Sequence, residues 1–319
     1  MALISLVSAA SDGVTTSAAG LALGSERPVL LAECDMSGGT LRGRLLREIR
    51  RPFGPLDAKG RVQQWEPLGP HIGLHKVAES FFASGGQDET NFIRQVEPHF
   101  WPLDDSDERF ALPGLIDPRQ AASLREVWPS LVHVLQLVDH ELKVDVVVDG
   151  GRMVLEGGHP HPVLSPAPLL HQSDIVLLVI RLADPASVML AAPMVEALQD
   201  ELSRHGTGAR ALGLLTLGNN TRREFHPGQV ERELEAPVVG SLAWDETAAA
   251  YLHQGGKPPR NLSRSALLRG ARDVMQPLRA YANQRRLQLQ LRQVQPGSPQ
   301  AMAQIRQLVL AQRQGALRG

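Results

Sequence analysis

Polar and small residues follow three apolar runs in this 319-residue sequence, and their types suit phosphate and metal chemistry. The first group is "AASDGVTT" (residues 9–16); the others are Glu33 and Asp35 in "RPVLLAECDMSGG" and Asp149 in "VDVVVDGG". The amides of a small-residue loop at a helix N-terminus bind phosphate, and carboxylates and hydroxyls are ligands for Mg²⁺. The first group therefore stands where a phosphate-binding loop would stand.

The opening loop matches a Walker A sequence only in part. Gly13, Thr15 and Thr16 stand where the last glycine and the two hydroxyl residues of "GK[ST]T" stand, and Val14 takes the lysine position. In such a loop the lysine contacts the β- and γ-phosphates and the hydroxyl contacts Mg²⁺. The alternative is an ordinary turn, in which the serine or the aspartate just before Gly13 caps the helix.

Histidines form a second group with metal-ligand spacing. His159 and His161 lie in "GGHPHP" and His171 follows nearby, while His71 and His75 are four residues apart. Two or three such side chains are a zinc-binding pattern. Prolines beside His159 and His161 indicate a loop, so we favour solvated loop histidines over a zinc site.

The elements that must position these residues alternate along the chain. Short apolar runs predict strands at Leu3–Ser8, Pro28–Glu33, Arg109–Leu112, Val144–Asp149, Ile175–Arg181, Ala211–Leu217 and Val238–Leu242. Helices are predicted at Thr15–Gly24, Gly39–Arg50, Pro118–Leu137, Ala186–His205, Pro227–Leu234 and Leu267–Tyr281. This alternation predicts an α/β fold, a doubly wound, mostly parallel sheet flanked by helices. Ligands in such sheets bind at the carboxyl ends of the strands.

Two regions depart from the alternation. Residues 52–108 contain proline, glycine, tryptophan and the acidic run "LDDSDE", so we expect an irregular insertion with one or two short helices, one near Asn91–Val96. From about Leu267 the chain is expected to be helical to its end, with a break at "PGSP". We therefore expect an α/β domain over residues 1–283 and a basic helical C-terminal tail over residues 284–319.

The composition excludes several classes of protein. Net charge is −1 and the pI is about 6.8, so broad nucleic-acid affinity is not expected. The single cysteine, Cys34, excludes an internal disulfide framework and fits a reducing compartment. No apolar run approaches the roughly 20 residues of a membrane span, and residues 1–7 predict a buried strand and not a signal peptide. We expect a cytoplasmic protein.

The order of these motifs resembles that of the MinD/ParA family of P-loop NTPases. Its members open with a deviant Walker A loop, KGGxGK[ST]T, and then carry a strand that ends in DxD before a glycine-containing turn. Asp35 matches the switch I aspartate of that strand, which activates the attacking water, and Glu33 stands for the first acid. "VDVVVDGG" is similar to the Walker B and switch II segment, whose aspartate, here Asp149, reaches Mg²⁺ through water.

Later segments carry the same resemblance, which covers roughly residues 1–52 and 109–280. "LGLLTLGNN" is similar to the strand that ends near the purine base, with Asn219 or Asn220 as base contacts, although a polar turn is the alternative. "APVVGSLAWDETAAAYLHQGG" is similar to the family segment "vPvlGxlPxD". The resemblance implies a P-loop NTPase fold, ATP and Mg²⁺ as cofactors, and a homodimer.

The resemblance also assigns roles to the residues of the opening loop. Gly13, Val14, Thr15 and Thr16 would bind the nucleotide, and Mg²⁺ would contact Thr15 and Asp149. The aspartate after the second strand would be the catalytic residue if the protein is active.

Two departures from the family pattern argue against rapid catalysis. Ala9 replaces the signature lysine, and Val14 replaces the P-loop lysine. Each lost charge-assisted bond to phosphate costs about 1.5–3 kcal/mol. ATP hydrolysis should therefore be weak or absent unless an arginine such as Arg42 or Arg152 substitutes.

Three functions follow from the resemblance. We favour a degenerate scaffold or positioning factor for pilus, secretion, division or segregation machinery, since a family subgroup that accompanies Tad/Flp-type pilus and secretion ATPases has a similar lysine-depleted loop. The second is an active ATPase with a lysine-poor loop, which the retained Asp35 and Asp149 favour. The third is a DNA-binding partition protein, but DNA is not an expected partner at this net charge.

The C-terminal tail has a pattern of its own. After Asp273 the chain has no acidic residue and seven arginines. Met302, Ile305, Leu308 and Val309 fall on one face of a predicted helix. A basic amphipathic helix binds an anionic membrane surface or a partner's groove, and MinD proteins end in a similar membrane-targeting helix. The alternative that stays open is packing of this face on the same protein.

Overall fold

The strands and helices are those of an α/β protein. The computed structural model describes residues 2–10, 13–57, 61–83, 89–205, 208–218 and 225–293. The sheet strands are β1 (Leu3–Ser8), β2 (Val29–Glu33), β5 (Trp101–Pro102), β6 (Arg109–Leu112), β7 (Asp145–Arg152), β10 (Ile175–Arg181), β11 (Leu212–Gly218) and β12 (Val238–Ala243). Two hairpins join β3 (Arg50–Leu56) to β4 (Val62–Pro67) and β8 (Leu155–Glu156) to β9 (His159–Pro160). The α-helices are α1 (Val14–Gly24), α2 (Leu74–Ala83), α3 (Glu89–Val96), α4 (Trp128–His140), α5 (Ala167–Gln172), α6 (Pro185–Arg204), α7 (Pro227–Glu233), α8 (Glu246–Gln254) and α9 (Ala266–Gln293).

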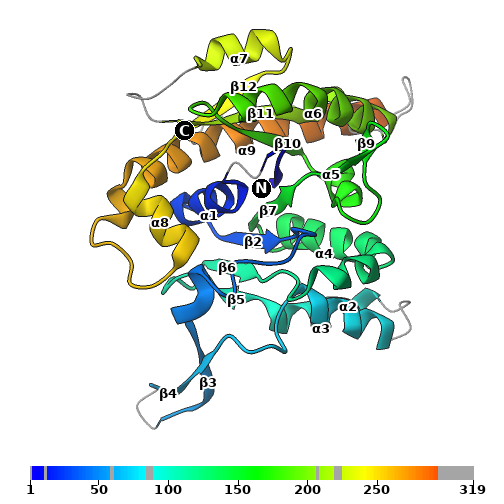
Figure 1. Ribbon diagram of the computed structural model, residues 1–319. Helices are drawn as coiled ribbons and strands as arrows, with labels where there is room; N and C mark the ends of the chain where they lie inside the picture. The colour runs from blue at the N-terminus through cyan, green and yellow to red at the C-terminus, as the bar shows by residue number, and fades with distance from the viewer. Residues whose placement is uncertain are drawn as a thin grey trace.

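One eight-stranded sheet forms the centre of the molecule, in the order β12-β11-β10-β1-β7-β2-β6-β5 (Figure 1). Neighbouring strands are parallel, except that β5 runs antiparallel to β6. This confirms the predicted doubly wound, mostly parallel sheet flanked by helices, with a helical C-terminal element, α9.

Helices cover both faces of the sheet. Ile4 and Leu6 of β1 pack into the core beneath α1, α8 and α9. Leu3 faces the core formed with α4, and Val7 faces the core formed with α6. Because the strands are buried on both faces, their sequences are continuous apolar runs and not alternating ones.

Arginines anchor helix α9 to buried acids at the amino edge of the sheet. Arg279 donates to Asp145 at 2.5 Å, and Arg286 bridges Asp139 and Asp174. All three aspartates are buried, and two of them also accept N–H groups from the start of β1. Part of the basic excess predicted for the tail is therefore neutralised inside the molecule, and the predicted boundary after residue 283 falls within α9.

The segment after β2 contradicts the helix predicted over Gly39–Arg50. Only a 3₁₀ turn forms there, at Leu45–Glu48, before the β3 strand begins. The N–H groups of residues 40–41 donate to the Glu33 side chain, and the Arg42 guanidinium donates to two carbonyls of the insertion. These tertiary hydrogen bonds fix the course of the segment.

The insertion is more regular than predicted. It contains the antiparallel β3–β4 hairpin besides two helices, one of which confirms the helix predicted near Asn91–Val96. The hairpin projects from the body (Figure 1), and Phe53 and Trp65 on it are each 55% exposed. Pro52 and Gly54 interrupt the β3 sequence, so the apolar pattern did not predict this strand.

Several predicted contact residues lie outside the described residues. They are Asn219, Asn220, Met302, Ile305, Leu308 and Val309. Among the helices of the described part, none has the length and apolar character needed to cross a membrane.

Candidate functional site

The carboxyl ends of β1, β7 and β2 bring the predicted acidic residues together. Strand β7 lies between the other two, and Asp149 pairs in register with Leu6 and with Glu33. Neighbouring strands lie about 4.8 Å apart. Asp149 is therefore next to the loop that follows β1 and next to the turn that contains Asp35, as the sequence predicted.

The opening loop enters α1 at Gly13. This residue has φ +85°, a left-handed conformation that favours glycine, and it occupies the N-cap position without a side chain. The alternative capping residues, Ser11 and Asp12, lie outside the described residues. At the lysine position Val14 is 4% exposed and belongs to the core, while Thr15 is half-buried.

Asp149 has the features of a metal ligand whose carboxyl group is buried away from solvent. The pKa of its carboxyl is raised to about 7, chiefly by burial and also by the charge of Glu33. Hydrogen bonds from the Thr15 hydroxyl and the Gly151 N–H oppose this shift. Its Oδ2 has no hydrogen-bond partner among the described residues. A carboxylate oxygen whose lone pairs accept no hydrogen bond, beside a hydroxyl, is a donor set that suits Mg²⁺.

The Glu33 carboxylate accepts hydrogen bonds from backbone N–H groups and is not directed toward a ligand. Its Oε1 accepts the N–H groups of Thr40 at 2.5 Å and Leu41 at 2.9 Å, and its Oε2 accepts the Gly114 N–H at 2.8 Å. Burial raises its pKa, and the three hydrogen bonds oppose that shift. The first acid of the DxD-like pair therefore fixes the loops that follow β2 and β6.

Asp35, the predicted catalytic residue, is half-buried above the strand ends. Its Oδ1 accepts the N–H of Ser37 at 2.8 Å and the Ser37 hydroxyl at 2.6 Å. Burial raises its pKa, and the bonds to Ser37 oppose the shift. The carboxyl lies against Gly151, two residues beyond Asp149. The two acids therefore belong to one cluster.

Two residues at this site were missed by sequence reasoning. A Cβ built on Gly13 would lie 3.5 Å from Cζ3 of Trp244, and the Arg181 guanidinium carbon lies 4.5 Å from the centroid of the same ring. This is within the range of a cation–π contact. The structure thus places an arginine beside the opening loop, whereas Arg42 is bound to carbonyls of the insertion and Arg152 is exposed at the end of β7.

The aspartate of the "LAWDE" segment has a structural role. Asp245 Oδ1 accepts the Ala248 N–H at 3.1 Å and caps α8, while Oδ2 accepts the Ala266 N–H at 3.1 Å at the start of α9. A capping carboxylate of this kind stabilises a helix by about 1 kcal/mol. Asp245 therefore sets the position of Trp244 through the backbone.

The structure does not bring His159, His161 and His171 together. His161 Nδ1 accepts two N–H groups of its own loop, and His159 lies 3.9 Å from Asp200 of α6. His171 lies instead against Glu201 of α6. His161 lies in the loop after β9, as favoured from the sequence, whereas His159 is part of β9.

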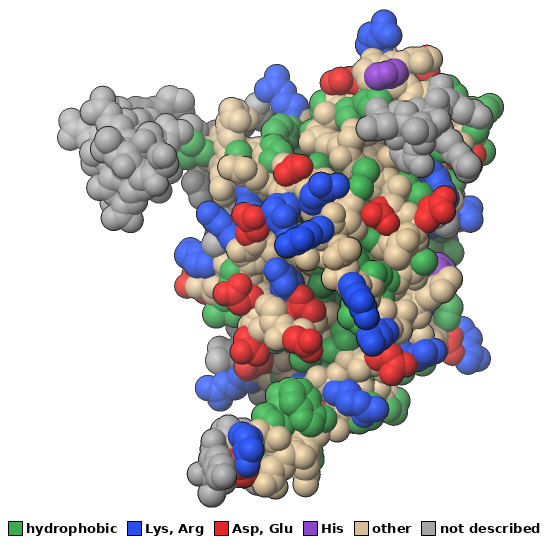
Figure 2. Space-filling view, turned by 90° about the vertical axis from the view of Figure 1, so that its left-hand side faces the viewer, with side chains coloured by type: hydrophobic (Ala, Val, Ile, Leu, Met, Phe, Trp, Pro, Cys, Tyr) green, Lys and Arg blue, Asp and Glu red, His purple; other side chains and the backbone are tan. Residues whose placement is uncertain are grey.

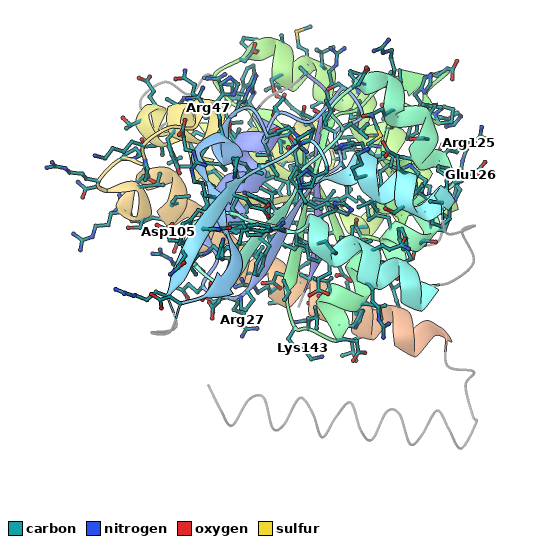
Figure 3. The ribbon with its side chains drawn as sticks, turned by 90° about the horizontal axis from the view of Figure 1, so that it is seen from below. Arg27, Arg47, Asp105, Arg125, Glu126 and Lys143 are labelled. Atoms are coloured by element: carbon teal, nitrogen blue, oxygen red, sulfur yellow. The ribbon has the colours of Figure 1, made fainter. Side chains whose placement is uncertain are left out.

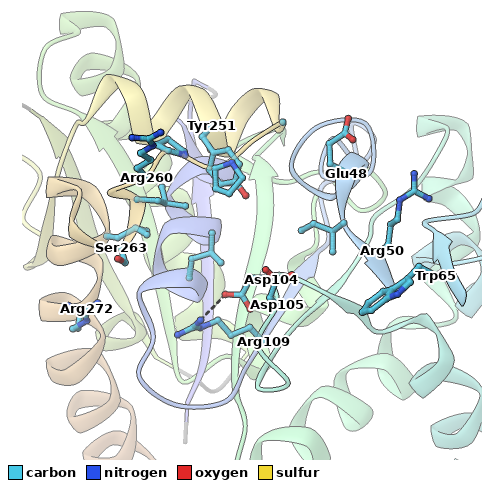
Figure 4. Close-up of a pocket in the computed structure, with 17 residues that line it drawn as sticks. Glu48, Arg50, Trp65, Asp104, Asp105, Arg109, Tyr251, Arg260, Ser263 and Arg272 are labelled. Carbon is cyan, nitrogen blue, oxygen red and sulfur yellow. Dashed lines mark hydrogen bonds and ion pairs between the residues drawn. The ribbon is translucent and has the colours of Figure 1, made fainter. Parts of the chain in front are cut away.

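Two cavities of the described structure lie away from this cluster. One of about 600 Å³ opens between α8, α9 and the β3–β4 hairpin, with Arg109 paired to Asp104 at 2.7 Å in its wall (Figure 4). The other, about 690 Å³ and apolar, lies between α4 and the starts of β2 and β6. Both cavities adjoin the amino ends of strands, opposite the predicted nucleotide site.

Comparisons with known proteins bear on the fold. No protein-family model and no curated protein matches the sequence significantly. Among solved structures, the septum site-determining protein MinD complexed with Mg-ADP from Pyrococcus horikoshii OT3 is 16% identical, with a TM-score of 0.57 over 89% of this chain and 99% of that one. A ParA family ATPase from Chlorobium tepidum TLS is 15% identical, with a TM-score of 0.55 over 86% of this chain and 98% of that one.

A third similar structure is the pNOB8 ParA bound to nonspecific DNA. It is 14% identical, with a TM-score of 0.51 over 88% of this chain and 99% of that one. Identity at this level establishes architecture and not activity. The chain therefore has the fold of the MinD and ParA ATPases.

Proposed function

We propose that this protein is a degenerate MinD/ParA-like scaffold or positioning factor with weak or absent ATP hydrolysis. The observation that carries the proposal is Val14, which stands at the P-loop lysine position and, as the first residue of α1, is buried in the core. An apolar, buried side chain offers neither charge nor a hydrogen-bond donor to phosphate.

The charges around the opening loop support the proposal. Glu33, Asp35 and Asp149 lie together at the strand ends, and burial raises the pKa of each. A triphosphate brought to this place would add negative charge to a cluster of carboxyl groups, with no lysine in the loop to compensate. Two missing charge-assisted bonds, at about 1.5–3 kcal/mol each, correspond to a few orders of magnitude in affinity.

The residues that would bind Mg²⁺ in a nucleotide site are better preserved than those that would bind phosphate. Thr15 and Asp149 would hold Mg²⁺, since the Asp149 Oδ2 has no partner in the described structure and oxygen donors suit this ion. Mg²⁺ would supply charge neutralisation to bound phosphates. The residues therefore fit the metal but only poorly fit ATP.

The alternative is an active ATPase that uses these residues for Mg²⁺ and Arg181 in place of lysine. The guanidinium near Gly13 favours it, and Asp35 would orient the attacking water. In that case Arg181 must leave the face of Trp244 to reach phosphate. The alternative therefore requires a rearrangement that a scaffold does not.

Steady-state ATP hydrolysis by the purified full-length protein decides between the two. A scaffold should release phosphate far more slowly than lysine-bearing relatives do. Turnover as fast as that of those relatives, lost in Asp35→Ala and in Arg181→Gln but retained in the exposed-surface variant Arg232→Gln, would overturn the proposal and establish the alternative.

We also propose that the protein acts as a homodimer and contacts a membrane or a protein partner through residues 299–318. The support is the amphipathic, acid-free sequence of that segment, which lies outside the described residues. Each arginine near an anionic surface adds roughly 1 kcal/mol. Liposome sedimentation of the full chain and of a chain ending at Pro296 tests the membrane contact, because equal pelleting of both would exclude it.

DNA binding stays the less favoured function. On the face shown in Figure 2, Lys and Arg side chains are interspersed with Asp and Glu, and no single-sign patch dominates. Seen from below, Arg125 and Glu126 likewise adjoin each other at the edge of the molecule (Figure 3). On the face that Figure 2 shows, the described residues do not form the uniformly basic surface that nonspecific DNA binding uses.

A further inference from the structure

Two histidines and a glutamate meet where two helices end, away from the strand-end cluster. His171 is in the last turn of α5, Glu201 is in the last turn of α6, and His205 is the residue that ends α6. Glu201 and His205 are four residues apart and therefore share one face of the helix. His171 reaches them from the neighbouring helix, 30 residues earlier in the sequence.

The three side chains converge on one point. His171 Nε2 lies 2.8 Å from Glu201 Oε1, and His205 Nε2 lies 3.3 Å from the same oxygen. The two rings are stacked, with centroids 3.9 Å apart and planes 11° from parallel. One ligand atom from each residue lies within 4.8 Å of the other two.

The surroundings of this cluster favour a cation. The side chains of His171 and Glu201 are only 14% and 13% exposed, so the carboxylate is largely removed from water. Arg204, the nearest arginine in the sequence, pairs with Asp200 at 2.9 Å and not with Glu201. The C-terminal end of the 20-residue α6 adds the negative end of a helix dipole.

We propose that His171, Glu201 and His205 bind one divalent transition-metal ion of the zinc class. Two imidazole nitrogens and one carboxylate oxygen are the protein ligands of many zinc sites, with water at the open position. Mg²⁺ and Ca²⁺ prefer oxygen ligands alone. The half-exposed His205 leaves the site open to solvent on one side, so an ion can enter.

Metal binding requires a small movement of one ring. The lone pair of each Nε2 lies in the plane of its ring, so two parallel rings cannot both direct lone pairs at one ion. His205 is 50% exposed, and a tilt of its ring toward Glu201 meets little packing. Without metal the same residues form a hydrogen-bonded trio, which is the competing arrangement.

A bound ion would fasten α5 to α6 at a distance from the nucleotide site. Helix α6 starts next to the carboxyl end of β10 and runs back for 20 residues, about 30 Å. Its last turn therefore lies at the opposite edge of the sheet. The metal would stabilise the packing of the two helices and would be independent of ATP binding.

Zinc titration of the full-length protein tests this site. After dialysis against a chelator, calorimetry in excess Mg²⁺ should show one Zn²⁺ per chain, and Zn²⁺ should raise the melting temperature. His205→Gln should bind at least about 10-fold more weakly, since even indirect ligand contacts are worth that much. Its half-exposed position means that the variant should fold. Glu201→Gln should weaken binding in the same direction.

The control is His226→Gln, which removes an exposed histidine at the start of α7. This variant should bind zinc as the unchanged protein does. Co²⁺ should also give the visible absorption of a four-coordinate ion, and that signal should be lost in His205→Gln. If the unchanged protein binds no Zn²⁺, or if His205→Gln binds it with unchanged affinity, the hydrogen-bonded trio is the correct description and the metal site is disproved.

Discussion

Gly151 has no room for a side chain, because the carboxyl group of Asp35 lies where its Cβ would project. Gly151 follows Asp149 at the end of β7, and its φ of +64° is in the left-handed region. The turn after β7 and the turn after β2 therefore fit against each other. The position of the catalytic candidate depends on this glycine as much as on its own hydrogen bonds to Ser37.

We expect Gly151→Ala to destabilise the protein more than Gly157→Ala does. The two glycines have similar φ values, +64° and +59°, so alanine incurs the same left-handed strain of about 1–2 kcal/mol at both. Only the methyl at Gly151 would overlap Asp35, since Gly157 has no other atom within 4 Å of an added Cβ. Overpacking adds roughly 1–3 kcal/mol, measurable as free energy of unfolding in urea.

A double variant tests the cause of that difference. Asp35→Ala removes the atoms that the new methyl would meet, so it should recover most of the additional loss in Gly151→Ala. The same substitution should not rescue Gly157→Ala. Equal destabilisation by the two glycine substitutions would mean that the turns after β2 and β7 do not pack together.

The sheet could be predicted from the sequence, and the loops could not. Leu3–Ser8 and Ile175–Arg181 have their predicted bounds because buried parallel strands read as continuous apolar runs. The helix predicted over Gly39–Arg50 was wrong, because only a 3₁₀ turn forms at Leu45–Glu48, after Glu33 has bound the N–H groups of Thr40 and Leu41. The helix predicted over Pro118–Leu137 is likewise divided, with a 3₁₀ segment before α4.

At the candidate site, too, some residues could be predicted from the sequence and others could not. Thr15, in the first turn of α1, and Asp149, within β7, were identified through the resemblance of their segments to P-loop NTPase motifs, and ligands of such sheets bind at the carboxyl ends of the strands. Trp244 and Arg181 were not predictable, since Trp244 lies against Gly13, and Arg181 against the Trp244 ring, only after β10 and β12 are placed on one side of β1. No local spacing in the sequence indicates such a contact.

Restoring a lysine in the opening loop should restore affinity for ATP. We expect Val14→Lys to bind ATP about 10- to 100-fold more tightly, because one charge-assisted phosphate bond contributes about 1.5–3 kcal/mol and the N-terminus of α1 remains to receive phosphate. Titration calorimetry measures the affinity. The fluorescence of Trp244, which lies beside Gly13, reports local binding.

The control for that experiment is Val14→Met, a longer apolar side chain without charge. Both variants replace the same buried residue, so comparing them separates the charge from the change in packing. If the lysine variant binds ATP no more tightly than the methionine variant, the loop has lost the geometry that cradles phosphate.

The stability that helix α9 contributes to the fold should depend on its buried ion pairs and not on its exposed ones. Arg286→Gln leaves Asp139 and Asp174 buried without their partner, and we expect a loss of about 3–5 kcal/mol in the free energy of unfolding. Arg272→Gln on the same helix breaks a pair whose side chains are 41% and 72% exposed, so it should cost less than about 1 kcal/mol. Similar losses in the two variants, measured by urea unfolding, would contradict the anchoring role of Arg286.

His99 should make the stability of the insertion depend on pH. The side chain is 8% exposed, and its Nδ1 accepts the Gly73 N–H at 3.4 Å. Its pKa is lowered to about 4, chiefly by burial and also by the nearby His75, His71, Arg51 and Lys76. The unprotonated ring is therefore the form that the fold accepts.

The sign of the effect follows from the two pKa values. In the unfolded chain a histidine has a pKa of about 6.5, so between pH values of about 4 and 6.5 the unfolded state binds more protons at this position than the folded state does. Stability therefore rises with pH across that window and gains nothing more from His99 above it. The folded pKa of Asp149, raised to about 7, contributes the opposite slope over the whole of that range.

Comparing variants removes that opposing contribution. His99→Gln keeps an acceptor for the Gly73 N–H but cannot titrate, so it should be more stable relative to the unchanged protein at pH of about 5 than at pH of about 8. Urea unfolding at both values measures the difference, and His226→Gln, an exposed position, should show no such dependence on pH. If the two glutamine variants have the same pH profile, His99 is protonated equally in the folded and unfolded states, and its burial does not control stability.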